Sequence, residues 1–289
     1  MSRPVFRFAP SPNGALHLGH ALSALTGFEM AQRFGGRFLV RIEDIDSHRA
    51  RPEFVQGIFD DLAWLGMTWE APVLTQSQHF ADYLAAAEKL HKLGVLYPCF
   101  ATRNEIIAVA DVGRLDPEGA LLYPGLWRGR SAEDTERERA QGKPFALRID
   151  MQYAIDLVRT KLGGAPLTFT EFDGAGSFRT AVADPGRWGD VLVIRKEIPA
   201  SYLLAVVVDD ARQGVTHVTR GMDLFAATDA QRVLQILLDL PEPVYHHHRL
   251  LLDGAGHKLS KSRGDSSLAS LRSKGASPAD IRRLVGLAE

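Results

Sequence analysis

Two histidines three residues apart, His17 and His20, follow a stretch rich in proline and glycine, FAPSPNG at residues 8–14. The apolar residues after them recur at helical spacing, so both rings are expected on one side of a helix's first turn. A helix amino terminus presents free N–H groups and the positive end of its dipole. We interpret the HLGH motif as a phosphate site, with Gly14 and Gly19 allowing close approach of the backbone.

A second motif, KLSKS at residues 258–262, lies about 240 residues further along the chain. Glycines flank it, so Lys258 and Lys261 are expected to move onto a bound triphosphate. Alone, each motif has a plain structural reading, as polar residues in a first helical turn or as a solvated basic loop. Together they predict an enzyme that activates a carboxylate with ATP, in which the histidines stabilise charge at the α-phosphorus as pyrophosphate leaves. The expected catalytic residues are His17, His20, Lys258 and Lys261, and the expected ATP contacts are these four with Pro10, Gly14, Gly19, Leu259, Ser260 and Ser262.

The elements around these motifs follow a strand–helix–strand–helix pattern typical of a parallel α/β unit. Residues 6–8 and 38–42 are expected as strands, and residues 18–31 and 52–65 as helices, the first of which stops at Gly35-Gly36. The pattern resumes with three further expected strands, at 191–194, 203–208 and 215–218. The run 203–208 is apolar throughout, as a strand covered on both faces requires. Thr228 is expected to cap a helix around residues 233–238, and Pro278 to open a short last helix.

Residues from about Cys99 to Lys143 interrupt this rhythm with scattered glycines and a charged run, 133–139, that is expected as an exposed helix. We therefore expect a Rossmann-type, doubly wound parallel α/β sheet with a mixed α/β insertion and a short C-terminal helical segment. The expected divisions are 1–98 and 186–248 for the two halves of the catalytic domain, 99–185 for the insertion, and 249–289 for the lysine loop and a helical tail.

The chain resembles class I aminoacyl-tRNA synthetases, and among them the glutamyl group. Residues 7–14, RFAPSPNG, and 41–46, RIEDID, are similar to that group's RFAPSPTG and RIEDTD segments. The resemblance continues through residues 202–210, 214–221 and 250–253 to the lysine loop. It implies a catalytic domain that forms an aminoacyl-adenylate.

The same resemblance implies a site for glutamate, whose two carboxylates suit arginine forks and whose ammonium suits an acid. Arg7 and Arg220 supply the forks, and either can take the side-chain carboxylate. Glu43, Ser11 and the Ala9 carbonyl are expected to hold the ammonium, and Tyr202 to offer a hydroxyl. Arg41, Asp44 and Asp46 are interpreted as partners in salt bridges at a strand end rather than as catalytic groups.

Where the chain stops bears on the acceptor. Glutamyl-tRNA synthetases carry a long helical region beyond the lysine loop to read the anticodon, whereas 27 residues follow Ser262 in this chain of 289. No anticodon-binding domain is therefore expected. Such a shortened chain resembles the family of glutamyl-Q tRNA(Asp) synthetases. The resemblance implies ATP with Mg²⁺, L-glutamate, and transfer of glutamate to queuosine in the anticodon arm of tRNA(Asp), which would occupy the cleft where relatives seat an acceptor stem.

The insertion departs from the family at a zinc site. Relatives carry Cys-x-Cys followed by Tyr-x-x-x-Cys, whereas this chain has Cys99-Phe100-Ala101 and a Tyr123–Trp127 segment without the later cysteine. A structural zinc takes about four ligands, so no structural zinc is expected. Packing by Phe100, Leu126 and Trp127 is expected in its place. The run His246–His248 is not expected to bind a metal, because neighbouring side chains of a strand point to opposite faces.

Composition limits the remaining possibilities. The formal net charge of −1 excludes a generally polybasic nucleic-acid binder, so RNA contacts must be local. The tail from Arg249 carries eight Lys/Arg against four Asp/Glu, either a phosphate-facing surface or a solvated helical face. A single cysteine, the missing apolar leader and the missing ~18-residue apolar span predict a cytoplasmic, non-membrane protein, expected as a monomer.

Three alternatives remain: an HxGH nucleotidyltransferase or ligase acting on a small metabolite, a non-catalytic RNA-binding paralogue, and a discriminating glutamyl-tRNA synthetase fragment working with a separate anticodon reader. The joint presence of Arg7, Glu43, Tyr202 and Arg220 speaks against the first. The intact histidines and lysines speak against the second.

Overall fold

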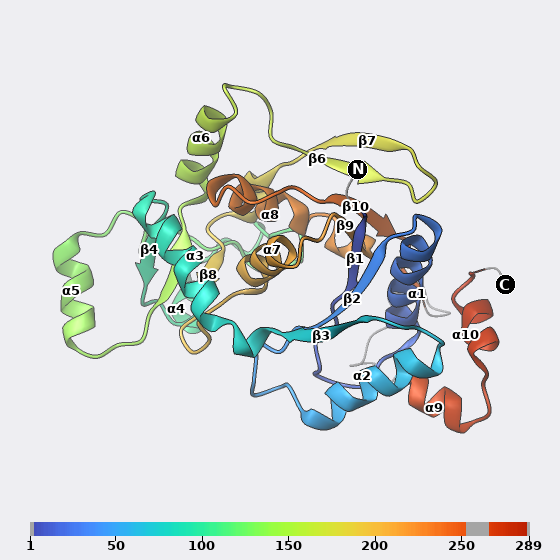
Figure 1. Cartoon of the computed structure of the whole chain (residues 1–289). Helices are drawn as coiled ribbons and strands as arrows, with labels where there is room; N and C mark the ends of the chain where they lie inside the picture. Colours follow the sequence, from blue (N-terminus) through green and yellow to red (C-terminus); the bar gives the residue numbers. More distant parts are fainter. Residues whose placement is uncertain (1–2, 253–265, 288–289) are drawn as a thin grey trace.

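The computed structural model describes residues 3–252 and 266–287, and at its centre lies a seven-stranded sheet in the order β3-β2-β1-β9-β10-β6-β7. The strands down to β6 run parallel, and β7 pairs antiparallel with β6 (Figure 1). The expected doubly wound α/β fold is confirmed. In sheet order the strands are β3 Glu70–Thr75, β2 Arg37–Ile42, β1 Val5–Phe8, β9 His217–Gly221, β10 Val244–His248, β6 Thr168–Phe172 and β7 Phe178–Val182.

Helices connect and cover these strands. They are α1 Leu18–Arg33, α2 Pro52–Trp64, α3 Phe80–Lys92, α4 Arg103–Val109, α5 Ala132–Ala140, α6 Met151–Lys161, α7 Tyr202–Arg212, α8 Ala227–Leu237, α9 Leu268–Ser273 and α10 Pro278–Leu284, with short 3₁₀ helices η1 Gln76–Gln78, η2 Pro185–Trp188 and η3 Met222–Leu224. None of the helices in the described ranges is long and apolar enough to cross a lipid bilayer.

The two faces of the sheet differ in chemistry because neighbouring side chains of a strand alternate. On one face, Phe6, Phe8 and Phe38 join the apolar core formed with α1 and α2. On the other face, toward α7 and α8, buried arginines 7, 41 and 220 stand among apolar residues. The sheet therefore carries its buried arginines on one face only, the face that lies toward α7 and α8.

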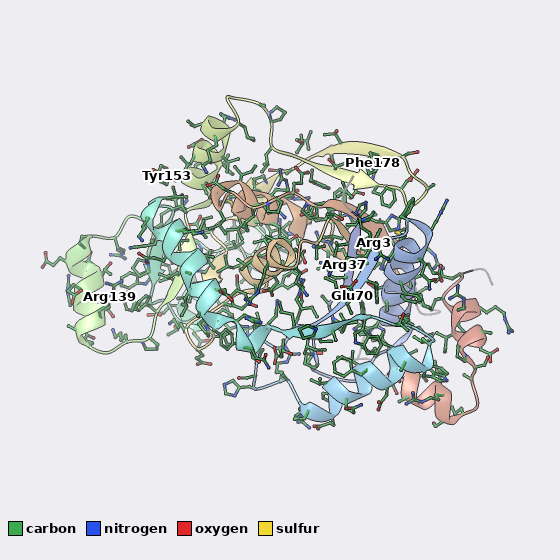
Figure 2. The ribbon with its side chains drawn as sticks, in the orientation of Figure 1. Arg3, Arg37, Glu70, Arg139, Tyr153 and Phe178 are labelled. Carbon is green, nitrogen blue, oxygen red and sulfur yellow. The ribbon has the colours of Figure 1, made fainter. Side chains whose placement is uncertain are left out.

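An ion pair joins β3, the outermost strand at one edge of the sheet, to β2. Arg37 of β2 donates to both carboxylate oxygens of Glu70 of β3, at 2.9 and 3.0 Å from Nε. Figure 2 shows the two side chains next to each other on neighbouring strands. This contact fixes the outermost strand against β2, at some distance from the motifs.

The prediction of a strand at 203–208 is wrong, because these residues form the middle of helix α7. Ser201 caps the helix by accepting from the N–H of Leu204, and Gly214 beyond its end has a positive φ of 64°. A continuous apolar run fits a buried helix as well as a buried strand, and here it packs against α3 and α8. Asp209 and Asp210 consequently lie on the last turn of a helix.

The prediction that Thr228 caps a helix is also wrong. Helix α8 begins at Ala227, one residue before Thr228, and has no side-chain cap. Thr228 lies inside its first turn, fully buried, and accepts a hydrogen bond from Arg220. The helices expected at 18–31, 52–65, 133–139 and after Pro278 are confirmed as α1, α2, α5 and α10, and α5 has no buried residue.

A second sheet of three antiparallel strands joins β4 Leu96–Cys99, β5 Ala146–Ile149 and β8 Leu192–Ile194. Residues 191–194 were expected in the second half of the catalytic domain, and their strand pairs with β5. Strands β6 and β7, from inside the range 99–185, pair into the seven-stranded sheet through β10. The limits 99–185 for an insertion stay a proposal.

The region around Cys99 and Tyr123, where no structural zinc is expected, is packed with aromatic groups. The rings of Phe100 and Trp127 lie 4.8 Å apart, and Leu126 and Trp127 pack against a cluster of Cys99, Ala101 and Tyr123. The Cys99 thiol lies 3.3 Å from the Tyr123 hydroxyl. The predicted packing is present, and the expected absence of zinc stays a prediction.

Candidate active site

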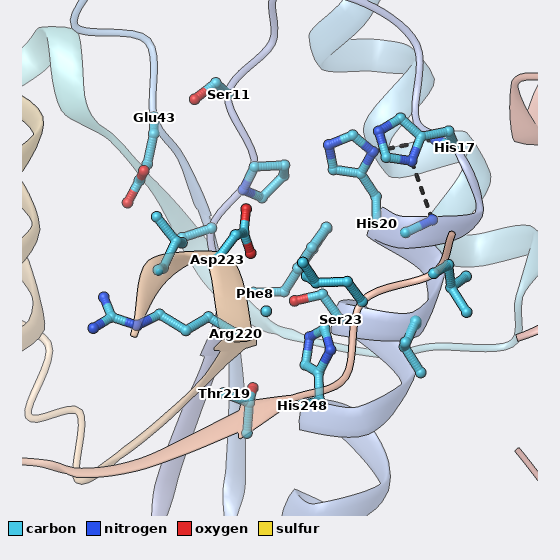
Figure 3. Close-up of a pocket in the computed structure, with 18 of the residues that line it drawn as sticks. Phe8, Ser11, His17, His20, Ser23, Glu43, Thr219, Arg220, Asp223 and His248 are labelled. Atoms are coloured by element: carbon cyan, nitrogen blue, oxygen red, sulfur yellow. Dashed lines mark hydrogen bonds between the residues drawn. The ribbon is translucent and has the colours of Figure 1, made fainter. Parts of the chain in front are cut away.

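A cavity of about 610 Å³ lies at the carboxyl ends of β1 and β9, where the chain turns in opposite directions along the sheet. In doubly wound folds ligands bind at such a switch point, because the loops leaving the two strands diverge and leave a crevice. Figure 3 shows its walls, with α1 on one side and Glu43 and Arg220 on the other. The sequence-predicted residues that line it are Arg7, Ala9, Pro10, Ser11, His17, Gly19, His20, Glu43, Tyr202 and Arg220.

The two histidines cap helix α1. His17 is its N-cap residue and accepts the N–H of Gly19 on Nδ1 at 3.1 Å, while His20 accepts the N–H of His17 on its own Nδ1 at 3.2 Å. The rings lie 3.9 Å apart (Figure 3). Since each Nδ1 accepts, the proton of each neutral ring is on Nε2, which makes that atom a hydrogen-bond donor.

Gly19 is required by this arrangement. A Cβ atom at residue 19 would lie 2.9 Å from Cε1 and 3.1 Å from Nδ1 of His17. Any side chain there would push the His17 ring out of its capping position. The glycine of the HLGH motif therefore leaves the space that the His17 ring occupies.

The acidic side of the cavity is a buried network centred on Asp210. Its Oδ1 accepts from Arg7 Nε at 3.1 Å and from Arg41 Nη1 at 2.7 Å. Arg41, fully buried, also donates to Glu43 Oε1 at 3.1 Å, and Asp209 lies 4.0 Å away. Burial raises the pKa of Glu43, and the positive charges of Arg41 and Arg7 oppose that rise. The pairs hold Glu43 and Arg7 rigidly at the cavity wall.

Arg41 is thus an ion-pair residue, as expected, and Asp44 has a different partner. Its two carboxylate oxygens accept from the N–H and the hydroxyl of Ser77, at 2.8 and 2.7 Å. The expectation of salt bridges is confirmed for Arg41 and wrong for Asp44, which fixes the start of η1 instead.

Arg220 differs from Arg7 in the charge of its partners. Its three nitrogens donate to His247 Nε2 at 3.0 Å, Gln231 Oε1 at 2.9 Å and Thr228 Oγ1 at 2.6 Å. No carboxylate within the described ranges forms an ion pair with it, whereas Arg7 is paired with Asp210. The Arg220 charge is therefore the one that a carboxylate ligand in the cavity can neutralise most favourably.

Tyr202 is the first residue of α7 and lines the cavity, and burial raises its pKa while Arg220 opposes that rise. The hydroxyl is therefore neutral and able to donate at physiological pH. Ser11 and Ala9, in the loop after β1, also line the cavity.

The structure adds residues that the motifs did not single out. Asp223, in η3 directly after β9, and His248, at the end of β10, line the cavity, as does Glu118 from a loop more than a hundred residues away from β1 in the sequence. Asp210 lies in the segment 202–210, which resembles the glutamyl group, so it could have been predicted from the sequence as an ion-pair partner for an arginine. Gly14 lies in the loop between Asn13 and His17, both of which line the cavity. The predicted residues Lys258, Leu259, Ser260, Lys261 and Ser262 lie outside the described residues.

Among the described residues, no group of three or more His, Cys, Asp or Glu side chains is arranged to hold a metal ion. Mg²⁺ is commonly held by substrate phosphates and one or two carboxylates rather than by an all-protein cage. The carboxylates of Asp223 and Glu118 at the cavity are of the type that would complete its coordination, where it would neutralise phosphate charge.

Comparison with known proteins gives the class. Residues 5–287 match the family described as tRNA synthetases class I (E and Q), catalytic domain. The fold is similar to the glutamate-tRNA synthetase of Elizabethkingia anophelis, with a TM-score of 0.77 over 98% of this chain and 61% of that one, at 22% identity. It is also similar, at a TM-score of 0.56 and 13% identity, to the methionyl-tRNA synthetase of Mycobacterium tuberculosis.

Comparison with similar sequences assigns the chain to a branch of this family. The chain is 46% identical to the glutamyl-Q tRNA(Asp) synthetase of Rhodobacter capsulatus, over 98% of this chain and 100% of the relative. It is 39% identical to the glutamyl-Q tRNA(Asp) synthetase of Symbiobacterium thermophilum, over 95% of this chain and 83% of the relative. It is also 35% identical to a glutamate–tRNA ligase of Prochlorococcus marinus, of which it covers 55%. The chain belongs to the class I glutamyl and glutaminyl tRNA synthetase family, in its glutamyl-Q tRNA(Asp) synthetase branch, and is an ATP-dependent ligase.

Proposed function

We propose that this protein activates L-glutamate with ATP, with Mg²⁺ accompanying the nucleotide, and transfers the glutamyl group to queuosine in the anticodon arm of tRNA(Asp). The observation that carries the proposal is the meeting of two chemically different walls on one cavity. The capped amino end of α1, with His17 and His20, forms one, and the charged set of Arg7, Glu43 and Arg220 forms the other.

The charged wall supports glutamate as the activated substrate. An amino acid with two carboxylates needs two cationic forks and an acid for its ammonium, and the cavity holds Arg7, Arg220 and Glu43. Ser11 and the Ala9 carbonyl lie on the Glu43 side, where they would complete the ammonium contacts. Tyr202 would donate its hydroxyl to a carboxylate.

The α1 wall supports attack at phosphorus. As the glutamate α-carboxylate bonds to the α-phosphorus and the bond to pyrophosphate breaks, negative charge grows on the phosphate oxygens. The Nε2–H groups of His17 and His20 are donors held in place before the reaction, so they would stabilise this charge without reorganisation. Lys258 and Lys261 are proposed to neutralise the departing pyrophosphate. An RNA hydroxyl would then attack the glutamyl carbonyl, and AMP would leave.

The relatives named glutamyl-Q tRNA(Asp) synthetase support the acceptor, since this chain covers 100% of one and 83% of another. We propose that the anticodon arm enters the cavity from the side of the three-stranded sheet, where Glu118 reaches the wall. We further propose that the protein acts as a monomer in the cytoplasm.

The test combines two measurements. Glutamate-dependent ATP–pyrophosphate exchange without tRNA is expected, and labelled glutamate is expected to transfer to tRNA from cells that make queuosine and not to tRNA from cells that lack it. Exchange without transfer to either pool would overturn the acceptor. Transfer to both pools would favour a discriminating glutamyl-tRNA synthetase, and exchange with another carboxylate only would favour a metabolite ligase.

The role of Lys261 is testable in the same assay. Lys261→Ala is expected to abolish most exchange while the thermal unfolding midpoint stays unchanged. Unchanged exchange in that variant would contradict the role proposed for the lysine loop.

A further inference from the structure

His247 does not line the cavity, but it contacts Arg220, which does. His247 of β10 lies behind Arg220 of β9, and the two residues are paired directly across the parallel ladder. The Arg220 Nε–H donates to His247 Nε2 at 3.0 Å. Since Gln231 and Thr228 accept from the other two nitrogens, all three anchors lie within the protein and the remaining N–H groups of the fork are left for a ligand.

The contact requires one protonation state of the imidazole. Nε2 can accept from Arg220 only if it carries no proton, so the proton must be on Nδ1. Glu171 of β6 supplies the acceptor for that proton, with Oε1 at 2.6 Å from Nδ1. The order along the sheet is therefore Glu171, His247, Arg220, on three neighbouring strands.

The three side chains are shielded from solvent. Arg220, Glu171 and His247 expose 4, 6 and 7% of their surface. The imidazole is stacked on Tyr245 at 5.9 Å between ring centroids and meets the edge of Phe225 at 5.0 Å. Burial lowers the pKa of His247, and this outweighs the opposing effect of the Glu171 hydrogen bond. A neutral imidazole against an ionised carboxylate is the state that this packing favours.

We propose that His247 is a positioning residue for the substrate carboxylate: held as one tautomer by Glu171, it accepts from Arg220 and aims the guanidinium into the cavity. The proposal rests on the proposed function for the identity of that carboxylate as part of glutamate. It assigns Glu171 and His247, which the sequence motifs did not mark, to substrate affinity rather than to folding alone.

Protonation of His247 would undo the arrangement. A proton on Nε2 would face the Arg220 Nε–H, leaving two donors and two positive charges in contact. The charged or titratable groups that face this imidazole are Glu171 from β6, with Arg179 of β7 behind it, Arg220 from β9 and Tyr245 from its own strand, and His246 acts on it from the other face of β10. Helix α8 presents only Thr228 and Gln231, which do not titrate. The KM for glutamate is therefore expected to rise as pH falls through the depressed pKa of His247.

The experiment measures glutamate-dependent ATP–pyrophosphate exchange of the full chain at pH 8 and across the range 5–8. His247→Phe, which keeps the ring and removes the acceptor, is expected to raise the KM for glutamate by about tenfold or more while the KM for ATP changes less than about twofold. His247→Gln restores an acceptor and is expected to recover most of the affinity. His246→Gln is the matched control, because that ring projects from the other face of β10 and contacts the Phe172 carbonyl; no change is expected.

Glu171→Gln separates positioning from folding. Loss of the carboxylate charge lowers the pKa of His247 further, so the acid rise in glutamate KM is expected to move to lower pH in this variant. Active wild type with an unchanged glutamate KM in His247→Phe, or an unmoved pH profile in Glu171→Gln, would overturn the inference and leave the proposed function standing. Absence of glutamate-dependent exchange in the wild type would instead remove the proposed function itself.

Discussion

At the scale of single residues, Asp210 has the most consequential position, because two buried arginines meet on its carboxylate. Arg7 and Arg41 both donate to Oδ1, and the side chain is 9% exposed. Asp210→Asn would remove the carboxylate that pairs with Arg7 and would leave Arg41 with only Glu43 and Asp209 as counter-charges. Breaking a buried pair in this way costs about 3–5 kcal/mol, so we expect a loss of about 3 kcal/mol in the free energy of unfolding.

The same substitution is expected to raise the KM for glutamate, since Arg7 would no longer be held at the cavity wall. Urea unfolding and pyrophosphate exchange measure the two effects. Asp60→Asn is the control, because Asp60 is exposed and contacts only Gln56 among side-chain partners given by the structure. A stability loss in Asp210→Asn no larger than in this control would contradict the bridging role.

Gly19 allows a sharper residue-scale test, because a glycine with open surroundings is present in a neighbouring helix. Gly19→Ala is expected to reduce exchange by at least about tenfold, since the new Cβ would displace His17. Gly57→Ala in α2 adds a methyl group where no atom lies within 4 Å, and should stabilise the protein by about 0.5–1 kcal/mol through helix propensity. Equal activity in both variants would show that the His17 position is unimportant.

At the scale of elements, helix periodicity located α1, α2, α5 and α10 correctly, because each has a start signal or a one-sided pattern. Helix α7 was misread since its apolar run has no polar side to reveal a period. Its Ser201 cap and Gly214 end were present in the sequence and could have corrected the interpretation. The capping role expected of Thr228 is wrong for another reason: helix α8 begins before Thr228, and the Thr228 hydroxyl accepts a hydrogen bond from Arg220 instead.

The packing of α2 against α9 gives a pH-dependent prediction. Asp61 of α2 is 2% exposed, and its Oδ1 lies 3.4 Å from Arg272 of α9. Burial raises its pKa to about 6, and Arg272 limits the rise. Because the folded pKa exceeds that of the unfolded chain, the folded state binds this proton more tightly. This group therefore adds stability as pH falls from 7 toward 4, the reverse of an ordinary ion-paired carboxylate.

Between pH 7 and pH 5 the wild type is expected to gain about 1 kcal/mol from Asp61 that Asp61→Asn does not gain. Urea unfolding of both proteins at the two pH values measures the difference, which cancels contributions from all other groups. Parallel pH dependence of the two proteins would mean that the Asp61 carboxylate is solvated in the folded state.

At the scale of the whole molecule, the fold explains why the motifs located the cavity without describing it. The segments with motifs follow β1, β2 and β9, and a doubly wound sheet brings these ends together. The residues that hold the motif side chains in position could not be predicted from the spacing of residues in the sequence. Glu171 and His247 lie 76 residues apart and Asp210 lies 203 residues from Arg7, and only strand order and helix packing bring them into contact.

The net charge of the whole protein limits how many RNA phosphates it can bind. The chain carries a net charge of −1, and three arginines of its cationic tail form contacts within the fold. Arg272 pairs with Asp61, Arg282 with Glu29, and Arg249 donates to the Val285 carbonyl. These arginines dock the C-terminal helices onto α1 and α2. We therefore expect phosphate contacts to be few, about three or four.

Each neutralised phosphate releases counterions, so the number of contacts is measurable as the slope of log K against log salt concentration. We expect a slope of about −2 to −3.5 for binding of a queuosine-containing anticodon arm between about 50 and 200 mM KCl. Fluorescence anisotropy with a labelled arm measures it, and the same arm without queuosine is the control. Because a nearly neutral protein gains little from the polyanion itself, the unmodified arm should bind much more weakly. A slope steeper than about −6, or equal binding of both arms, would mean that backbone charge rather than the modified base dominates recognition.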